Sequence, residues 1–394
     1  MDSFYEIHQR KNTRSLKWDM LQAVFQSTDV LPMWVADMDF KAPDKVNNAI
    51  INRAKHGIWG YTMVDQNVKK AIVNWLHHRH TWQIEHSWLS FSPGVVTSLH
   101  LAVEAFTEPN DKILIQTPVY TPFYEVIEKH QRTVVKNPLV LKDNYYQIDF
   151  NDFEKKLKGG IKAFILCSPH NPVGRVWTKK ELLKIAELCL KYDVLILSDE
   201  IHSDLVFPNY THTPIASLSE NISRQTVTFM SPSKTFNMAG LQASYIITED
   251  RLKRTHLNRH LQKYGLGLLN TLGNVGLEAA YNHGKSWLEE LIKVLVENRN
   301  YVTKMFEEQT NTLKVIRSEG TYLMWIDCSK LQFDCKSLRN FMIEEAKVGL
   351  NQGIDYGAEG EQFVRINIAC PPSTIQEGVK RIIDAVNKRE SALN

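Results

Sequence analysis

Three short segments of this chain carry side chains whose types and spacing suit ligand chemistry. The first, residues 231–237, reads SPSKTFN. The amine of Lys234 can form a Schiff base with a carbonyl compound, and the hydroxyls of Ser231 and Ser233 suit a phosphate group. Taken alone, this pattern is more often that of a solvated loop, so its meaning depends on the other segments.

The second segment, residues 197–205, reads LSDEIHSDL. Asp199 closes a predicted buried strand, where an unpaired carboxylate is costly. A protonated pyridine nitrogen is a fitting partner, because an ionised Asp199 keeps that nitrogen protonated and strengthens the ring as an electron sink. His202 lies three residues further on and can reach the same ligand. A structural aspartate that caps the next segment is an equally good explanation at this point.

The third segment, residues 168–174, reads SPHNPVG. Two prolines and a glycine fix a rigid loop after an apolar strand. Asn171 can offer a hydrogen bond from a defined place in that loop, for instance to a phenolic oxygen. Turn chemistry by itself also accounts for the segment.

Three further positions join the candidate set. Gly94 precedes an apolar helical stretch, and a glycine at a helix start exposes backbone N–H groups that suit a phosphate. Tyr120 follows a strand end and can stack on a flat ring, although a core tyrosine explains it as well. Arg365 lies in an alternating strand, where an inward arginine needs a partner such as a substrate carboxylate. An ordinary edge-strand arginine is the competing interpretation.

The elements that position these residues alternate in type between residues 90 and 250. Amphipathic stretches such as Lys179–Lys191 separate several strand-like runs, which predicts a mostly parallel sheet covered by helices. The strand candidates are 112–116, 133–137, 163–167, 194–198, 226–230 and 243–248. In such sheets ligands bind outside the carboxyl ends of the strands. All three chemically rich segments follow strand candidates, so we expect them to meet there.

Beyond residue 270 the pattern changes to that of a smaller α+β domain. A helical stretch covers 269–309 with a break near 282–284, followed by strands at 322–327 and 363–369 and helices at 337–346 and 374–389. We expect three parts. Residues 1–45 form an arm that joins the small domain, 46–283 form the large domain, and 284–394 form the small C-terminal domain.

Composition excludes several function classes. The 394 residues contain 47 basic and 44 acidic side chains, a balance that gives no case for nucleic-acid binding. No apolar run approaches the roughly 18 residues that span a bilayer, and the N-terminus lacks a signal-peptide pattern, so we expect a cytoplasmic protein without membrane contact. Five cysteines without Cys-x-x-Cys spacing argue against disulfides and zinc. The histidines of residues 77–80 are expected on a solvated helix face, not at a metal.

In this order the motifs resemble those of the fold-type I pyridoxal-phosphate enzymes, the aspartate aminotransferase superfamily, and the resemblance covers essentially the whole chain. It implies a large domain with a mostly parallel sheet and a smaller α+β domain. Finer features resemble the cystathionine β-lyase (C–S lyase) branch. They are residues 33–40 (MWVADMDF), His202, residues 174–177 (GRVW) and residues 239–242 (AGLQ). Many transaminases carry a phosphate-binding arginine where Gln242 stands.

The resemblance also implies roles for individual residues. Lys234 holds pyridoxal 5'-phosphate as a Schiff base and moves the proton at the substrate Cα. Asp199 pairs with the pyridine nitrogen, Asn171 and His202 serve the phenolic oxygen, and Tyr120 stacks on the ring. Arg365 binds the substrate α-carboxylate. The phosphate is held by the backbone N–H groups of Gly94, Val95 and Val96, by Ser231 and Ser233, and by Tyr61 of the neighbouring subunit. That last role implies a homodimer with shared active sites.

The implied reaction is an α,β-elimination that converts cystathionine or another S-substituted cysteine to a thiol, pyruvate and ammonia. An aminotransferase, or a lyase with an added regulatory binding role, is the alternative. One position departs from the family pattern, because Pro372 stands where the family often has arginine. The substrate range is therefore less determined than the chemistry, and nothing in the sequence fixes the leaving group.

Overall fold

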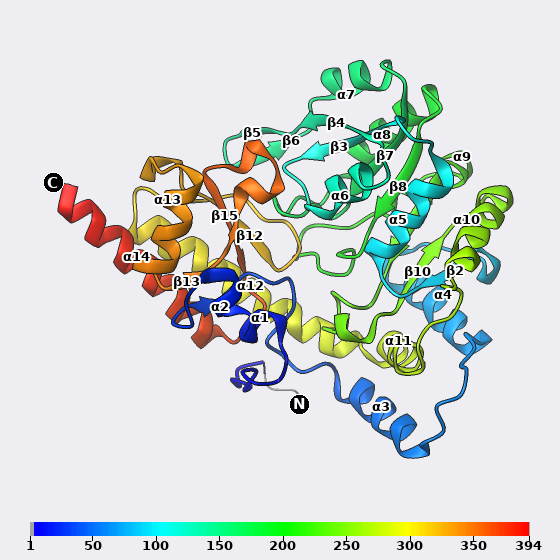
Figure 1. Ribbon diagram of the computed structural model, residues 1–394, viewed down its shortest axis with the longest axis horizontal. Coiled ribbons are helices and arrows are strands. Elements are labelled where there is room, and N and C mark those ends of the chain that lie inside the picture. The colour runs from blue at the N-terminus through cyan, green and yellow to red at the C-terminus, as the bar shows by residue number, and fades with distance from the viewer. Residues whose placement is uncertain (1–3, 394) are drawn as a thin grey trace.

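The computed structural model describes residues 4–393, so the first three residues of the predicted arm lie outside it. Its largest sheet has seven strands in the order β2-β10-β9-β8-β7-β3-β4 (Figure 1). They are β2 (Leu89–Ser92), β10 (Ser244–Ile247), β9 (Thr226–Met230), β8 (Leu195–Asp199), β7 (Ile161–Cys167), β3 (Lys112–Thr117) and β4 (Thr133–Pro138). Within this sheet β10 alone runs antiparallel to its neighbours. The predicted mostly parallel sheet is confirmed.

Helices cover this sheet because its central strands are buried along almost their whole length, which leaves both faces in need of apolar cover. They are α5 (Val95–Phe106), α6 (Pro122–Glu128), α7 (Phe150–Leu157), α8 (Lys179–Lys191), α9 (Glu220–Arg224) and α10 (Arg251–Lys263). The predicted bounds of α8 are confirmed. Thr178 and Glu181 form a reciprocal capping box at its start, which fixes where the helix begins. A two-stranded hairpin, β5 (Val140–Lys142) and β6 (Tyr145–Gln147), lies beside the sheet.

The predicted break in the long C-terminal helical stretch is also confirmed. Helix α11 (Thr271–His283) ends at Gly284 and α12 (Lys285–Gln309) follows it directly. A Cβ at Gly284 would lie 2.3 Å from the ring of Phe236. The glycine is therefore required by the close approach of that ring, and the chain turns there.

A smaller antiparallel sheet forms the second centre. Its order is β11 (Lys314–Val315), β12 (Leu323–Asp327), β15 (Phe363–Asn367) and β14 (Asn351–Gln352). Helix α14 (Pro372–Leu393) packs with α12 beside it. The helix predicted at 337–346 is α13 (Cys335–Asn340) continued by a π-helical turn over Phe341–Glu345. Pro372 opens α14, a position where proline loses no hydrogen bond.

The N-terminal segment lies against this second part (Figure 1). After α1 (Leu16–Asp19) and α2 (Leu21–Phe25), strand β1 (Leu31–Pro32) pairs in parallel with β13 (Val348–Gly349). The chain then crosses to α3 (Asp44–His56) and α4 (Gln66–His80), which pack against α11. The domain limits at residues 45 and 283 stay a prediction. Over residues 4–393, every helix is too short or too polar to cross a membrane.

Candidate functional site

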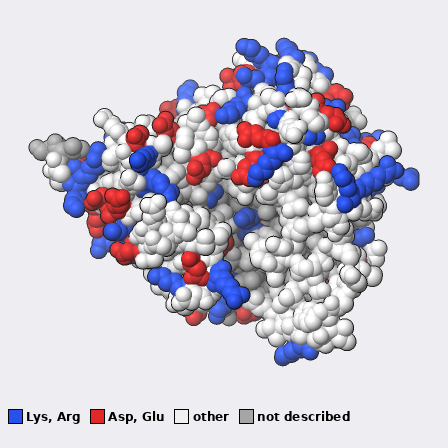
Figure 2. Space-filling model, in the orientation of Figure 1, with Lys and Arg blue, Asp and Glu red and all other residues white. Residues whose placement is uncertain are grey.

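A cavity of about 210 Å³ opens at the carboxyl ends of β7, β8 and β9 and at the start of α5. Figure 2 shows a hollow near the centre of this face, with Lys or Arg atoms at its floor. The cavity wall brings together ten of the residues predicted from the sequence. They are Gly94, Val95, Val96, Tyr120, Asn171, Asp199, His202, Ser231, Ser233 and Lys234. The predicted convergence of the segments at one sheet edge is confirmed.

One end of the cavity suits an anion. Helix α5 begins at Val95, and among residues 4–393 no side chain caps its first turn, so its backbone N–H groups are free to bind a ligand. The Ser231 hydroxyl contacts the Oγ of Ser233 at 2.8 Å and the carbonyl of Ala243 at 2.6 Å. Ser231 therefore holds the Ser233 hydroxyl beside the helix start, where a phosphate would gain from both.

Asp199 lies at the far end of β8 with 4% of its surface exposed. The backbone N–H of Ile201 donates to its Oδ1 at 3.2 Å, and no ion pair reaches it from the residues that the structure describes. Burial raises the pKa of this carboxyl to about 7. Such a group gains strongly from a cationic partner in the cavity, and a protonated ring nitrogen is one.

Lys234 donates from Nζ to the carbonyl oxygen of Ala36 at 2.6 Å. Burial lowers the pKa of its amine to about 8, and the Arg365 guanidinium acts in the same direction. A larger fraction of the amine is then neutral near pH 7 than for an exposed lysine. This favours Schiff-base formation and proton transfer. The same Ala36 oxygen accepts a hydrogen bond from the hydroxyl of buried Tyr322 at 2.9 Å.

Asn171 and His202 face the cavity from neighbouring loops. Asn171 accepts a hydrogen bond through Oδ1 from Arg365, and its own carbonyl accepts one from the N–H of Tyr120. Burial lowers the pKa of His202 to about 3, so the ring is neutral at ordinary pH. Its Nδ1 is buried without a partner among the described residues. An unpartnered buried ring nitrogen beside an amide suits a polar ligand atom.

Arg365 lies on β15, between β12 and β14, and is 3% exposed. Its guanidinium donates to the Trp34 carbonyl at 2.8 Å, to Asn351 Oδ1 at 2.6 Å and to Asn171 Oδ1 at 3.1 Å. These acceptors are neutral oxygens, so the guanidinium charge is not cancelled by them. The predicted inward arginine is confirmed, and the edge-strand interpretation is wrong. A ligand carboxylate is a fitting counter-ion.

Tyr61 is not brought to this cavity. It lies in the loop between α3 and α4 and is fully exposed, at 102% of its reference surface. Other apolar side chains near it in sequence are also exposed, namely Ile58 at 67%, Trp59 at 54% and Met63 at 70%. Within one chain, Tyr61 therefore contributes nothing to the cavity.

One histidine of the 77–80 run corrects the solvated-face prediction. His77 and His78 are exposed, but the side chain of His80 is only 3% exposed, and its Nε2 lies 3.0 Å from Asp204 Oδ1. Asp204 also accepts a hydrogen bond from the hydroxyl of Thr235, beside Lys234. Among residues 4–393, no group of three or more His, Cys, Asp or Glu side chains is placed to hold a metal.

Sequence reasoning also missed Ala36 and Tyr322. Ala36 acts through its main-chain carbonyl, which every residue type has, so its identity gives no signal. Tyr322 stands among the apolar residues of a predicted strand and is indistinguishable there from a core aromatic. Only the meeting of residues 36, 234 and 322 reveals either one.

The family model for aminotransferases of class I and II matches residues 28–382. The chain is 46% identical over 386 residues to the protein named cystathionine β-lyase PatB from Bacillus subtilis, covering 98% of this chain and 100% of that one. The solved structure of cystalysin from Treponema denticola, which contains pyridoxal 5'-phosphate, has a TM-score of 0.96 at 38% identity and covers 99% and 100% of the two chains. The PLP-bound C–S lyase from Staphylococcus hominis has a TM-score of 0.91 at 34% identity and covers 98% of each.

Proposed function

The chain belongs to the aminotransferase class I and II family, and we propose that it is a pyridoxal-phosphate-dependent carbon–sulfur lyase. Its reaction is the α,β-elimination of cystathionine or another S-substituted cysteine to a thiol, pyruvate and ammonia. One observation carries the proposal. Lys234, the buried carboxyl of Asp199 and the uncapped start of α5 line a single cavity. The likeness to proteins named as lyases of this kind extends over the whole chain.

The cavity fits the cofactor group by group. Asp199 lacks a cation and His202 Nδ1 lacks a partner among the described residues, and the ring of pyridoxal phosphate offers a nitrogen and an oxygen. Asn171 would share the phenolic oxygen with His202, and Tyr120 would stack on the ring. The phosphate would be held by the N–H groups of Gly94, Val95 and Val96 and by the hydroxyls of Ser231 and Ser233. When bound, the cofactor supplies an electron sink conjugated to the substrate amine.

The side chains of this protein supply the binding and proton transfer. Arg365 grips the substrate α-carboxylate and so fixes Cα in front of Lys234. With the cofactor bound, the Nζ of Lys234 would remove the proton from the substrate Cα. A base with a pKa of about 8 is well matched to that step near neutral pH. Loss of that proton would let a Cα–Cβ double bond form as the Cβ–S bond breaks, so the sulfur would leave with the bonding electrons and take up a proton as the thiol. Water would then convert the remaining three-carbon fragment to pyruvate and ammonia.

We also propose a homodimer in which Tyr61 of each chain completes the phosphate site of the other. Tyr61, Trp59, Ile58 and Met63 are exposed and lie on one connection between α3 and α4. Figure 2 shows few charged side chains over the lower right of the molecule, where α3 lies in Figure 1. Apolar groups gathered in this way are typical of a surface that a partner covers. We further propose the cytoplasm as its location, since all five cysteines are free thiols.

The first experiment measures pyruvate and free thiol released from cystathionine and from several S-alkyl-cysteines in the presence of pyridoxal phosphate. Equal amounts of the two products support the lyase. Conversion of the cofactor to its pyridoxamine form by an amino acid, without pyruvate, supports an aminotransferase instead. Lys234→Ala should abolish turnover, whereas Lys41→Ala, which alters an exposed lysine, should not. Elimination by Lys234→Ala at the parent rate would refute the assignment.

A further inference from the structure

The segment of residues 33–40, whose side chains have no part in the proposed reaction, runs through the site as an irregular strap with bends at residues 35–37 and 39–40. Its carbonyls alternate between two sides. Those of Trp34 and Ala36 accept hydrogen bonds from Arg365 at 2.8 Å and from Lys234 at 2.6 Å. Those of Val35 and Asp37 both accept from the side-chain amide of Asn367 at 2.6 Å. The strap therefore presents one row of oxygens to the two functional cations and is fixed from behind.

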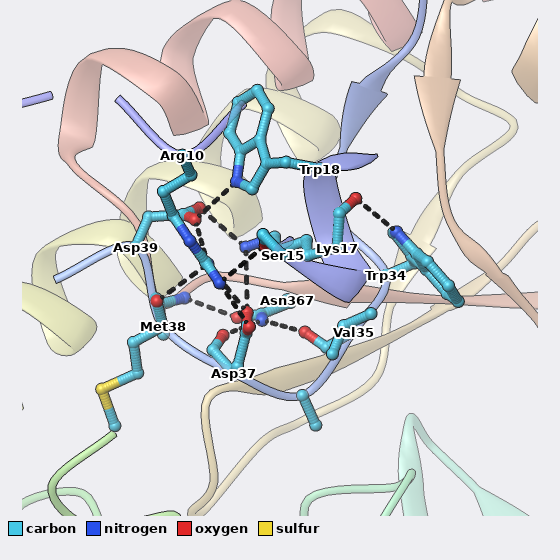
Figure 3. A network of polar contacts seen from close by, with 12 residues as sticks. Arg10, Ser15, Lys17, Trp18, Trp34, Val35, Asp37, Met38, Asp39 and Asn367 are labelled. Atoms are coloured by element: carbon cyan, nitrogen blue, oxygen red, sulfur yellow. Dashed lines mark hydrogen bonds and ion pairs between the residues drawn. The ribbon is translucent and has the colours of Figure 1, made fainter. Parts of the chain in front are cut away.

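Behind the strap lies a compact group of charges, shown in Figure 3. We call it the arm cluster, and it consists of Arg10, Lys17, Asp37 and Asp39. The guanidinium of Arg10 donates to Asp37 Oδ2 at 2.6 Å, to Asp37 Oδ1 at 3.1 Å and to Asp39 Oδ1 at 2.6 Å. It also donates to the carbonyl of Met38 at 3.0 Å. Arg10 thus grips two carboxylates and one carbonyl of the strap with a single planar group.

Lys17 completes the cluster from the same arm. Its side chain is 1% exposed, and its Nζ lies 2.7 Å from Asp39 Oδ2. The indole N–H of Trp18 donates to the other oxygen of Asp39 at 2.9 Å. Two cations and two anions leave the cluster neutral overall, and every carboxylate oxygen has a donor. Lys17 and Asp39 are buried and Arg10 and Asp37 are partly buried, and a cluster satisfied to this degree has little freedom to move.

We propose that Arg10 is a positioning residue that, through Asp37, holds the carbonyls of Trp34 and Ala36 against Arg365 and Lys234. This inference builds on the proposed lyase function, since it concerns the two side chains that the reaction uses. It assigns a task to the arm and to the two aspartates of the 33–40 motif. The arm is not only packed against the protein but sets the place of the substrate-binding and proton-transferring groups.

The electrostatics of Lys234 give this arrangement a measurable consequence. The hydrogen bond to Ala36 favours the charged ammonium, so a strap that moves away lowers the pKa of Lys234. Several charged or titratable groups face or surround this amine. They are Asp37 on the strap, Asp199 at the end of β8, His202 after it, Arg365 on β15, Tyr322 before β12, Cys167 at the end of β7 and Tyr120 after β3. Arg10→Lys keeps a positive charge in the arm cluster but loses the planar fork. It therefore tests position more than charge.

The first test uses cofactor-free protein and follows the reaction of Lys234 with an amine-selective reagent against pH, read by mass spectrometry. For Arg10→Lys we expect the midpoint to fall by about one unit, the effect of losing one charge-assisted hydrogen bond. Arg14→Lys is the matched control, because Arg14 lies on the same arm and is exposed. It should leave the midpoint unchanged. A lower melting temperature with an unchanged midpoint for Arg10→Lys would mean that the cluster serves stability alone.

The second test is kinetic and uses the cofactor-loaded enzyme. We expect Arg10→Lys to lower kcat/KM roughly tenfold, partly through KM, because the strap also holds Arg365. If Arg10 acts through Asp37, the double variant Arg10→Lys with Asp37→Asn is no worse than the weaker single variant. Strictly additive losses would overturn the proposal. Because the first test needs no turnover, a protein that lacked lyase activity could still show the shift in Lys234, and the two proposals fail separately.

Discussion

Replacing Asp199 with Asn should stabilise the cofactor-free protein at neutral pH while weakening its hold on the cofactor. Asp199 is 4% exposed, and burial raises the pKa of its carboxyl from 3.8 to about 7. A carboxyl raised in this way adds to stability in full below its unfolded pKa, and this contribution is lost as the pH rises through about 7. Asn does not ionise, so the variant avoids the loss, and its Oδ1 can still accept the hydrogen bond from Ile201.

The size of the gain follows from the same displacement. The pKa of the Asp199 carboxyl rises from 3.8 to about 7, and each tenfold change in its acid dissociation constant corresponds to about 1.4 kcal/mol. The difference in the free energy of unfolding should therefore be small near pH 4, about 2 kcal/mol at pH 5.5 and about 4 kcal/mol at pH 8. The loaded enzyme should show the opposite preference, because Asn carries no negative charge to stabilise a protonated ring nitrogen.

Urea unfolding of both cofactor-free proteins between pH 5 and 8 measures the difference directly. Asp143→Asn is the control, since Asp143 is exposed in the turn between β5 and β6. It should show no growing difference with pH. A gain for Asp199→Asn that is the same at every pH, or a loss of stability at pH 7.5, would refute the reasoning. A spectrophotometric titration with pyridoxal phosphate then checks the expected loss of affinity.

Three further outcomes follow from the contacts described above. Arg365→Lys should reduce kcat/KM roughly 100-fold, mainly through KM, because a lysine cannot grip a carboxylate with two parallel donors; steady-state kinetics decides this. Trp59→Asp should shift the protein toward monomer in sedimentation experiments, since it places a charge on the exposed apolar loop, and an unchanged dimer would contradict the proposed interface. Asp204→Ala should lower the free energy of unfolding by about 3–5 kcal/mol in urea, because it strands His80 and Thr235, and a change below about 1 kcal/mol would argue against that.

Much of the fold could be predicted because its signals are local. The six predicted strands of the large sheet are all present, with ends within about two residues, since buried parallel strands appear as short apolar runs. The start of α8 and the break at Gly284 were predictable because a capping box and a glycine are also local sequence signals. The cavity followed from one topological rule, that loops after neighbouring parallel strands share an edge. The roles of Asp199, Asn171 and Lys234 remain predictions that the experiments above test.

What could not be predicted depends on contacts between residues distant in the sequence. The run of residues 77–80 follows an apolar helical stretch and has no carboxylate or cysteine at ligand spacing, which predicts a solvated face. The partner of His80, Asp204, is 124 residues away in the sequence. Arg10 lies in an arm without periodicity, and nothing nearby shows that it meets Asp37 and Asp39. The side chain of a histidine or an arginine can be either solvated or buried with a partner, and the tertiary fold determines which state occurs.

The arm cluster and the polar wall of the cavity differ in whether their charges are paired within the protein. This difference distinguishes a structural cluster from a ligand-binding site. The arm cluster needs no ligand, because Arg10 and Lys17 form ion pairs with the carboxylates of Asp37 and Asp39. The cavity is not complete, since among the described residues Asp199 has no counter-ion and the pKa values of its carboxyl and of Lys234 are both displaced toward their neutral forms. Buried polar groups without a partner lower the free energy of unfolding, unless a bound ligand supplies the missing charge or hydrogen bond. The stabilisation expected for Asp199→Asn measures that cost, and its reversal on adding the cofactor would show what the site is built to hold.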